Sequence, residues 1–281
     1  MTKIWLNGTI CAGDKALSAN ERGFLLGEGL FETILIKSGS PRLWNAHIER
    51  LFHSCATFGF ACPYDKATLA QAADDLIASK NNMVLRITVT GGVGGRGLVP
   101  PQEQSPTWLM QISPAPSSPA PSKNPALKLA VSPITRLADH ISNAHKTTNY
   151  FDNILARRQA LATGADEAVL LNQYGRVACA AAASIFIVKD NSLSTPPISE
   201  GAMNGIIRQT LLNLETTPLS QAPIQEAPLT LAALHQADMI LLCNSVIEVK
   251  AAYITAPAET RAQNLALSFT QAFIQILDEI D

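Results

Sequence analysis

The sequence predicts an α+β protein built from two domains. Stretches with strand-like and with helix-like apolar periodicity occur in both halves of the 281-residue chain. A proline-rich segment lies between the halves. Hydrophobic residues make up 47% of the chain and charged residues 16%, a composition typical of a protein with extensive buried surface.

The N-terminal domain is expected to span residues 1–113. Its strands are predicted at 3–7, 31–37, 83–90 and 107–113, and its helices at 45–60 and 66–80. The first helix has Asn45 as its expected N-cap and Gly59 as its end signal. Strands and helices mixed in this way indicate an α/β or α+β unit.

A linker is expected at residues 114–126. The segment SPAPSSPAPSKNP, residues 113–125, holds five prolines among small polar residues. Such a segment is too stiff and too polar for a core, so it marks the domain boundary.

The C-terminal domain is expected to span residues 127–281. Its strands are predicted at 127–134, 167–172, 184–190 and 239–249, and its helices at 149–163, 204–215, 229–236 and 262–279. The second and third of these strands flank a turn at Gly175, and we expect them to pair as a hairpin.

The net charge and the cysteine pattern limit the classes of binding partner and the cellular compartment that the sequence favours. A net charge of −2 gives no electrostatic reason to expect nucleic acid or a membrane as partner. No apolar run approaches the roughly 20 residues that span a bilayer, and the N-terminal run is too short for a signal peptide. The five cysteines are scattered, which favours reduced thiols in the cytoplasm over disulfides or a zinc site.

The glycine run TGGVGGRGLVPP, residues 90–101, partly matches a dinucleotide-binding loop. Such a site needs a helix directly after the glycines, so that the helix N-terminus meets the pyrophosphate. Pro100 and Pro101 follow instead. Two interpretations remain, a hairpin tip without function or a pliable loop on which Arg96 binds a substrate carboxylate.

The histidines do not indicate a metal site. His140 and His145 are five residues apart, and His47 and His53 are six apart, so neither pair shares a helical face. Each histidine is expected to be a capping or surface residue. The nucleophile motif GxSxG of serine hydrolases is absent.

Lys146 is the strongest candidate for chemistry. A lone lysine is normally a solvated charge, but this one occurs with features suited to a phosphorylated cofactor. Arg50 supplies a cation, and residues 203–209 (MNGIIRQ) open a helix whose backbone N–H groups can bind an anion. Residues 243–249 (CNSVIEV) place small polar side chains where a buried strand is predicted.

These motifs resemble those of the fold-type IV pyridoxal-phosphate enzymes, the class IV aminotransferase family. The similarity runs nearly end to end, and the order and spacing of the motifs make it specific. The motifs are NERGFLLGEGLFETIL (20–35), HIERL (47–51), GGRG (94–97), HKTTNYFDNILARRQA (145–160), GADEAVLLN (164–172), GRVACAAAASIF (175–186), NGIIRQ (204–209) and CNSVIEV (243–249).

The resemblance implies roles for single residues. Lys146 matches the lysine that binds the cofactor aldehyde, and Arg50 matches the arginine that binds the cofactor phosphate. The other matches are Gly205, Ile206 and Ile207 at the helix start that receives the phosphate, and Asn244 and Ser245 in the loop that closes this site. The cofactor implied is pyridoxal 5'-phosphate, and no metal is implied.

The resemblance also implies the architecture. Family members have a small N-terminal α/β sandwich and a larger C-terminal pseudo-barrel domain, with the cofactor at their interface. They form homodimers whose sites borrow loops from the partner. We therefore expect a homodimer here.

Within the family, the motifs look most like those of 4-amino-4-deoxychorismate lyase, which forms 4-aminobenzoate and pyruvate for folate synthesis. The loop around Arg96 lacks the Arg-x-His pair of D-amino-acid aminotransferases. Lys146 is the expected catalytic residue, and Arg96 is expected to hold a carboxylate of the small-molecule substrate. Three alternatives stay open: a branched-chain or D-amino-acid transaminase, a cofactor-binding protein with little or no turnover, and an unrelated α+β protein.

One position departs from the family pattern. After the turn at Gly175, the family normally has Val-Thr-Glu, but here Ala178 and Cys179 replace the last two residues. The family glutamate would pair with the pyridine nitrogen and make the ring an electron sink. A thiol cannot supply that negative charge. Cys179 is thus the expected neighbour of the ring nitrogen. Glu167 stands at the start of the strand predicted at 167–172, and the sequence leaves the direction of its side chain open.

Overall fold

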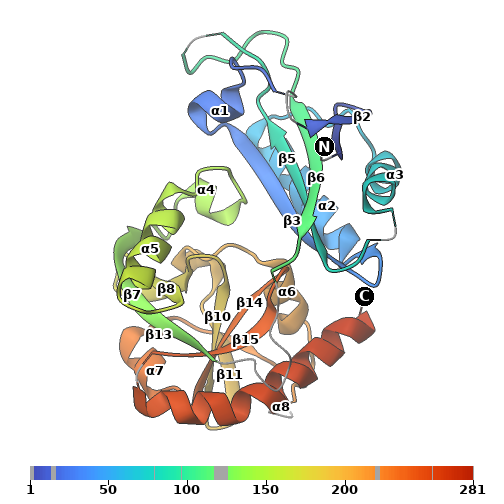
Figure 1. Cartoon of the computed structure of the whole chain (residues 1–281). Helices are drawn as coiled ribbons and strands as arrows, with labels where there is room; N and C mark the ends of the chain where they lie inside the picture. The colour runs from blue at the N-terminus through green and yellow to red at the C-terminus, as the bar shows by residue number, and fades with distance from the viewer. Residues whose placement is uncertain are drawn as a thin grey trace. The chain divides into compact units, whose positions relative to one another are not determined.

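The computed structural model describes residues 3–13, 17–78, 80–95, 97–116, 126–218, 222–254 and 256–280. The chain divides into two compact units (Figure 1): residues 1–116 with 145–149, and residues 117–144 with 150–281. The short segment 145–149 contains Lys146 and groups with the first unit. The boundaries expected from the sequence stay predictions, and most of the expected linker, residues 117–125, lies outside the described residues.

The first unit is a sandwich of one sheet and a layer of helices. Its antiparallel sheet has six strands in the order β2-β1-β6-β5-β3-β4. The strands are β1 (Lys3–Leu6), β2 (Thr9–Ala12), β3 (Gly29–Lys37), β4 (Ser40–Pro41), β5 (Met83–Thr90) and β6 (Thr107–Pro114). The helices are α1 (Arg22–Leu26), α2 (Trp44–Phe58) and α3 (Lys66–Ile77). Apolar side chains of α2, α3 and the sheet form one core, among them Leu51, Leu76, Ile34 and Trp108.

Helix α2 tests two local predictions. Gly59 caps its C-terminus with a φ of 73°, a left-handed conformation that glycine adopts without steric cost, so the predicted end signal is confirmed. The predicted N-cap, Asn45, is wrong because this residue already lies within the helix. The N-cap is Leu43, with a φ of 51° and no capping side chain. The chain turns sharply after β4, and this turn rather than a cap sets the helix start.

The second unit is built on one sheet of nine strands in the order β12-β11-β10-β14-β15-β7-β8-β9-β13. The strands are β7 (Leu127–Arg136), β8 (Glu167–Asn172), β9 (Arg176–Ala180), β10 (Ser184–Lys189), β11 (Ser192–Thr195), β12 (Gln225–Glu226), β13 (Leu229–Thr230), β14 (Met239–Asn244) and β15 (Glu248–Tyr253). The helices are α4 (Ile141–Ala144), α5 (Phe151–Ala162), η3 (Ile198–Glu200), α6 (Ile206–Leu212), α7 (Leu231–Gln236) and α8 (Ala256–Ile280). Helix α5 packs on β7 and β8, and the long α8 packs on β14 and β15 (Figure 1).

The sheet of the second unit curls back on itself. Strands β9 and β10 are separated by several strands in the pairing order, yet only residues 181–183 connect them. The N–H of Ala180 donates to the carbonyl of Ala183 at 2.8 Å, which keeps this connection tight. A flat sheet could not bring two such distant strands together, so the curvature agrees with the pseudo-barrel expected from the resemblance.

The structure corrects two strand predictions in this unit. The hairpin of 167–172 with 184–190 is wrong, because β8 pairs with β9 whereas β10 pairs with β11 and β14. The single strand predicted at 239–249 is wrong too, because β14 and β15 are antiparallel partners joined by a tight turn. Asn244 Oδ1 closes that turn by accepting the N–H groups of Val246 and Ile247, each at 2.8 Å.

Three general features complete the description of the fold. All five cysteines are free thiols, as expected. Among the residues that the structure describes, no group of side chains could hold a metal ion. Within the same residues, no helix has the length and apolarity needed to cross a membrane.

The loop between β5 and β6 provides a stability prediction. Gly92 has a φ of +77°, and a Cβ there would lie 1.9 Å from the carbonyl oxygen of Ser105. Gly39 has a similar φ of +81° but nothing within 4 Å of its added Cβ. We expect Gly39→Ala to lower the free energy of unfolding by roughly 1–2 kcal/mol through backbone strain alone, and Gly92→Ala to lower it clearly further. Denaturant unfolding measures both variants, and equal losses would contradict the clash.

Candidate active site

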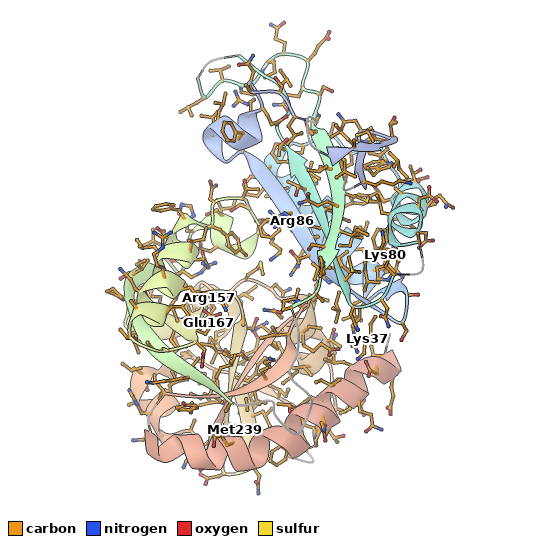
Figure 2. All side chains as sticks on the ribbon, viewed as in Figure 1. Lys37, Lys80, Arg86, Arg157, Glu167 and Met239 are labelled. Atoms are coloured by element: carbon orange, nitrogen blue, oxygen red, sulfur yellow. The ribbon has the colours of Figure 1, made fainter. Side chains whose placement is uncertain are left out.

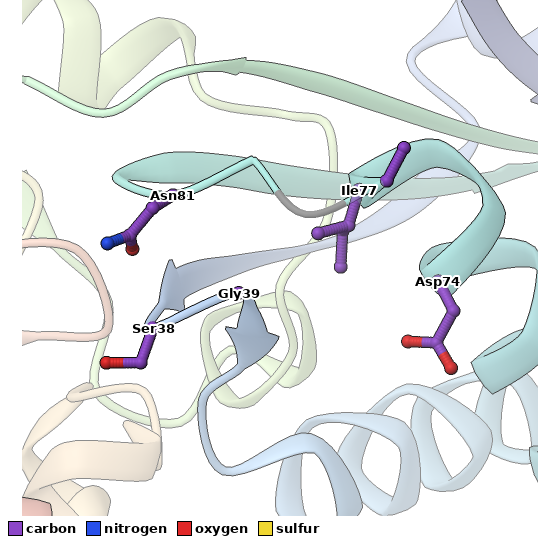
Figure 3. Close-up of a pocket in the computed structure, with 6 residues that line it drawn as sticks. Ser38, Gly39, Asp74, Ile77 and Asn81 are labelled. Atoms are coloured by element: carbon purple, nitrogen blue, oxygen red, sulfur yellow. The ribbon is translucent and has the colours of Figure 1, made fainter.

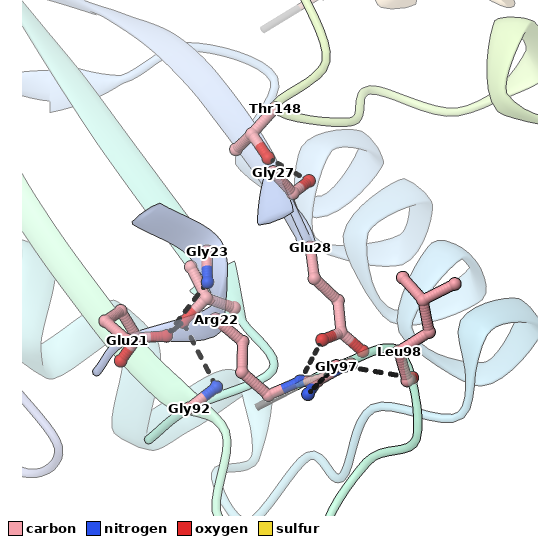
Figure 4. Close-up of polar contacts among 10 residues, drawn as sticks. Glu21, Arg22, Gly23, Gly27, Glu28, Gly92, Gly97, Leu98 and Thr148 are labelled. Carbon is pink, nitrogen blue, oxygen red and sulfur yellow. Dashed lines mark hydrogen bonds and ion pairs between the residues drawn. The ribbon is translucent and has the colours of Figure 1, made fainter. Parts of the chain in front are cut away.

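Backbone pairing places Lys146 at the edge of β3. The N–H of Phe31 donates to the carbonyl of Lys146 at 2.9 Å, and the N–H of Thr148 donates to the carbonyl of Gly29 at 2.9 Å. The Thr148 hydroxyl adds a bond to the carbonyl of Gly27 at 2.7 Å (Figure 4). Residues 146–148 therefore extend the sheet like a short strand, and the position of Lys146 is set by main-chain contacts.

The neighbouring residue His145 anchors the same segment to α2. Its Nδ1 lies 2.9 Å from the hydroxyl of Ser54, and its ring stacks on His53 with centroids 5.7 Å apart. The Phe58 ring meets it edge-on at 4.9 Å. This packing ties the segment to α2 in addition to its bonds with β3.

Lys146 itself is half-buried. Its Nζ lies 4.3 Å from the centroid of the Phe31 ring. Burial is the main cause that lowers the pKa of Lys146; the charge of Glu32 opposes it, the charges of Arg50 and Arg86 add to it, and the net pKa is about 8. At a pKa of about 8, roughly a tenth of this amine is neutral and nucleophilic at pH 7, far more than for a solvated lysine with a pKa of about 10.4.

Glu32 is the acidic centre of this cluster. Burial raises its pKa, but the charge of Arg50 and hydrogen bonds from His47 and Arg50 outweigh burial and hold the pKa at about 2. Arg50 Nε donates to Glu32 Oε1, and Arg50 Nη2 donates to Oε2, both at 2.7 Å. Arg50 thus meets an ionised carboxylate through two parallel bonds.

His47 overturns the expectation that every histidine is a capping or surface residue. It is only 1% exposed, and its Nδ1 lies 2.7 Å from Glu32 Oε2. Burial lowers the pKa of His47 although Glu32 pulls it upward, so the ring is neutral at pH 7 and donates its Nδ1–H. His47 and Arg50 are three residues apart on α2 and hold the same carboxylate. The sequence signal for this contact was Glu32 itself, a single acid in the apolar strand GLFETILIK.

Arg86 is a further residue that the sequence analysis missed. It lies on β5 (Figure 2), and its Cζ is 3.8 Å from the centroid of the Phe31 ring. Its Nε donates to the Thr88 hydroxyl at 3.2 Å. Because the Lys146 amine contacts the same ring, Arg86 is a second guanidinium in the lysine's surroundings. A lone arginine in the apolar strand MVLRITVT was the available signal.

Apart from Arg50, which lies on α2 of the first unit, the residues expected at the phosphate gather at one end of β10 and β14 in the second unit. Gly205 is the N-cap of α6, and no side chain caps the helix. The backbone N–H groups of Ile206 and Ile207, the first two residues of α6, are therefore available to an anion. A Cβ at Gly205 would lie 3.0 Å from the hydroxyl of Ser184. Glycine therefore allows the close approach of this backbone to β10.

Asn244 and Ser245 lie at the same end of the sheet. Ser184 pairs with Cys243 across β10 and β14, so the next residue, Asn244, lies near the start of β10. Asn244 Nδ2 donates to the carbonyl of Ala182 at 2.8 Å, and Ser245 follows in the half-buried turn before β15. Within the second unit, an uncapped helix start and small polar residues are groups that suit a phosphate.

Cys179 is buried in β9, next to Leu170 of β8. Burial raises the pKa of its thiol; Arg136 opposes this and Glu167 adds to it. The thiol is therefore protonated and uncharged at neutral pH. Glu167 is not free to replace the missing acid: its Oε1 accepts the N–H of Ala168 at 2.9 Å, and Arg157 lies 3.4 Å from its Oε2 (Figure 2).

Arg96, the expected carboxylate binder, lies outside the described residues. The loop beside it is held by Arg22 (Figure 4). The Arg22 side chain forms an ion pair with Glu28, and it donates to the carbonyls of Gly97 at 3.1 Å and Leu98 at 3.2 Å. These hydrogen bonds fix the backbone of the loop at Gly97 and Leu98, directly after position 96.

A hollow in the first unit lies away from these residues (Figure 3). It is lined by Ser38, Gly39, Asp74, Ile77, Ala78 and Asn81. Ser38 and Gly39 follow the last residue of β3, whereas the Lys146 segment pairs with the first residues of this nine-residue strand. At about 3.3 Å per residue, the two places are well over 15 Å apart, so the hollow is not part of the lysine site.

Proteins similar to this chain are named for different activities. A Methanocaldococcus jannaschii protein, whose assignment as a branched-chain-amino-acid aminotransferase is provisional, is 31% identical over 88% of this chain and 85% of its own length. The aminodeoxychorismate lyase of Vibrio harveyi is 28% identical over 88% of this chain and 89% of its own. The D-alanine aminotransferase of Listeria innocua is 29% identical over 84% and 81%.

Solved structures show the same fold. The 4-amino-4-deoxychorismate lyase of Pseudomonas aeruginosa is 28% identical, with a TM-score of 0.76 over 93% of this chain and 97% of that one. The T.th. branched-chain aminotransferase, solved with pyridoxamine 5'-phosphate, gives a TM-score of 0.86 over 98% and 94%. At 21% identity this second likeness shows the fold alone.

The family model of amino-transferase class IV matches residues 29–251. This range includes Glu32, Arg50, Lys146 and the residues of the second unit that are expected at the phosphate. The match confirms the family and the α+β fold expected from the sequence, and it supports the expected pyridoxal-phosphate cofactor. The chain belongs to the class IV aminotransferase family.

Proposed function

We propose that this chain is a pyridoxal-phosphate-dependent 4-amino-4-deoxychorismate lyase that forms 4-aminobenzoate and pyruvate. The family and the lowered pKa of the Lys146 amine support pyridoxal-phosphate chemistry. The observation that carries the choice of a lyase is Cys179, an uncharged buried thiol where the resemblance places the acid of the family. A homodimer in the cytoplasm is part of this proposal.

Lys146 has two roles in the proposed reaction. Its neutral amine would hold the cofactor through the aldehyde group until the substrate amine takes its place. The freed Nζ then removes the proton from the carbon that bears the substrate nitrogen, and afterwards a proton returns to the departing enolpyruvate. When bound, pyridoxal 5'-phosphate supplies an electron-accepting ring conjugated to that carbon.

Binding and orientation fall to the residues around Lys146 and to the second unit. Arg50 would bind the cofactor phosphate, as would the N–H groups of Ile206 and Ile207. Gly205, Asn244 and Ser245 would shape that site, as the resemblance implies. Arg96 remains the proposed carboxylate binder. Arg86, which shares the Phe31 ring with Lys146, is a second cation that could hold a substrate carboxylate.

The charge state of Cys179 favours elimination over amino exchange. A protonated pyridine nitrogen stabilises a carbanion strongly, and a thiol provides no negative charge to keep that proton. Transamination depends on this stabilisation. Elimination from aminodeoxychorismate forms an aromatic ring, which makes the step favourable with a weaker electron sink.

A transaminase is the second candidate, and a specific observation favours it. The Methanocaldococcus jannaschii relative named as an aminotransferase is more similar in sequence, at 31% identity, than the Vibrio harveyi lyase at 28%. Mixing the protein with an amino acid and 2-oxoglutarate, and measuring glutamate, separates the two activities. A chain that binds cofactor but forms neither product would be the third case, a binding protein without turnover.

The decisive assay is incubation of the cofactor-loaded protein with aminodeoxychorismate. We expect 4-aminobenzoate and pyruvate in equal amounts. Lys146→Ala should lose both the visible absorption of the lysine-bound cofactor and product formation. Lys66→Ala is the matched control, because Lys66 is an exposed lysine paired with Glu49. Colour in the Lys146→Ala protein equal to that of the control would exclude Lys146 as the anchor.

The lowered pKa of Lys146 is measurable in the protein without cofactor. In protein labelled with 13C at lysine Cε, one resonance should titrate with a midpoint at about pH 8, and it should be missing from Lys146→Met. The sign follows from burial, which disfavours the charged amine. A midpoint at the ordinary value of a solvated lysine would contradict the role of Lys146 as a nucleophile.

Restoring the acid at position 179 tests the argument from charge. We expect Cys179→Glu to raise the rate of glutamate formation from 2-oxoglutarate at least about tenfold, which corresponds to roughly 1.4 kcal/mol of added stabilisation. Cys179→Ser, which stays uncharged, serves as the control. Circular dichroism checks that both variants fold. Equal rates of amino exchange in the two folded variants would remove the argument for a lyase that rests on Cys179.

A further inference from the structure

We propose that Glu32 is a positioning residue that acts on the cofactor through Arg50 and Lys146. It fixes the plane of the Arg50 guanidinium, and it supplies the negative charge that balances the basic groups around Lys146. This inference rests on the proposed function, because it assumes that Arg50 and Lys146 bind the cofactor. Neither the family match nor the resemblance gave Glu32 a role.

The first step is the geometry of the contact with Arg50. Two donors of the guanidinium, Nε and Nη2, meet the two carboxylate oxygens of Glu32, both at 2.7 Å. Two parallel bonds define the guanidinium plane, whereas one bond would leave it free to rotate. The carboxylate is 1% exposed, so water does not compete for it. Arg50 can therefore present its remaining edge in one orientation.

The second step is that Glu32 is itself held rigidly. His47 donates to Oε2 at 2.7 Å, the same oxygen that accepts from Arg50 Nη2. His47 and Arg50 come from one face of α2, while Glu32 comes from the interior of β3. The carboxylate thus joins helix to strand at the point where Lys146 pairs with β3.

The third step is the charge around Lys146. The Lys146 amine and the Arg86 guanidinium lie 4.3 Å and 3.8 Å from the centroid of one ring, that of Phe31. Arg50 is another basic group near the lysine, and Glu32 is a carboxylate that attracts its proton. In a partly buried site such charges interact more strongly than they do in water. Without Glu32 these three basic groups would lose the carboxylate that attracts the proton of Lys146.

A structural role alone is the competing explanation, and Glu21 provides the comparison. Glu21 is a buried carboxylate of the same unit, 2% exposed. It accepts the hydroxyl groups of Thr90 at 2.6 Å and Thr107 at 2.7 Å. Replacing Glu21 with Gln removes a buried charge and weakens comparable hydrogen bonds, but it leaves the surroundings of Lys146 unchanged. Glu21→Gln is therefore the matched control.

The experiment uses the full-length protein loaded with pyridoxal 5'-phosphate. Three quantities are measured for wild type, Glu32→Gln and Glu21→Gln: the thermal midpoint, the dissociation constant of the cofactor, and the pH midpoint of the visible band of the lysine-bound cofactor. Loss of the negative charge makes protonation of the nitrogen at Lys146 harder. We expect Glu32→Gln to shift the pH midpoint downward by at least about one unit, which is about 1.4 kcal/mol, and to weaken cofactor binding about tenfold.

A second variant separates charge from geometry. Glu32→Asp keeps the charge but shortens the side chain, so it should leave the pH midpoint near that of wild type while it weakens cofactor binding through the loosened Arg50. This variant also keeps the inference testable if Glu32→Gln does not fold. An unchanged dissociation constant in Glu32→Asp would overturn the positioning of Arg50.

The control decides between the two explanations. Glu21→Gln can lose thermal stability to the same extent, but its pH midpoint and its cofactor affinity should match wild type. If Glu32→Gln loses stability and nothing else, or if both variants shift the midpoint equally, Glu32 is merely structural and the inference fails. These readouts do not involve turnover, so they can succeed where the lyase assay fails. If wild-type protein forms no visible band at all, the proposed function fails, and the inference with it.

Discussion

The site depends on one main-chain contact, the pairing of residues 146–148 with the first residues of β3. In the sequence these residues are flanked on both sides by parts of the second unit, yet their backbone bonds make them part of the first. Main-chain bonds do not depend on the side chain at position 146. A substitution there can therefore remove the amine without moving the segment, and the lysine is free to react while its backbone stays in place.

That contact brings a lysine into a place that is costly for a charged amine. Burial alone disfavours the ammonium form, and two arginines add to the effect. A buried charge cluster is a weak source of stability, because the desolvation of its members offsets their attraction. Glu32, Arg50 and Lys146 are therefore better explained by what the neutral amine can do than by what their pairing contributes to folding.

The sequence predicts elements well where the local pattern is decisive and poorly where distant contacts decide. The predicted strand 83–90 coincides with β5, because alternating apolar residues define it. Strand β9 was missed because its small residues carry little period, and its existence depends on pairing with β8. The segment 239–249 appeared continuous, since the turn closed by Asn244 leaves no glycine or proline signal.

The candidate site shows the same difference between what local sequence patterns reveal and what only contacts between distant residues reveal. Motif order located Lys146 and Arg50, but Glu32, His47 and Arg86 became visible only through contacts between α2, β3 and β5. Cys179 was visible in the sequence as a departure, yet its meaning depends on burial, which makes the thiol neutral. An exposed thiol could ionise and act partly like the missing acid, whereas a buried one cannot. In the proposed function, where Cys179 adjoins the cofactor ring, the ring nitrogen would therefore lack a negatively charged partner, and elimination to an aromatic product would depend less on that charge than amino exchange would.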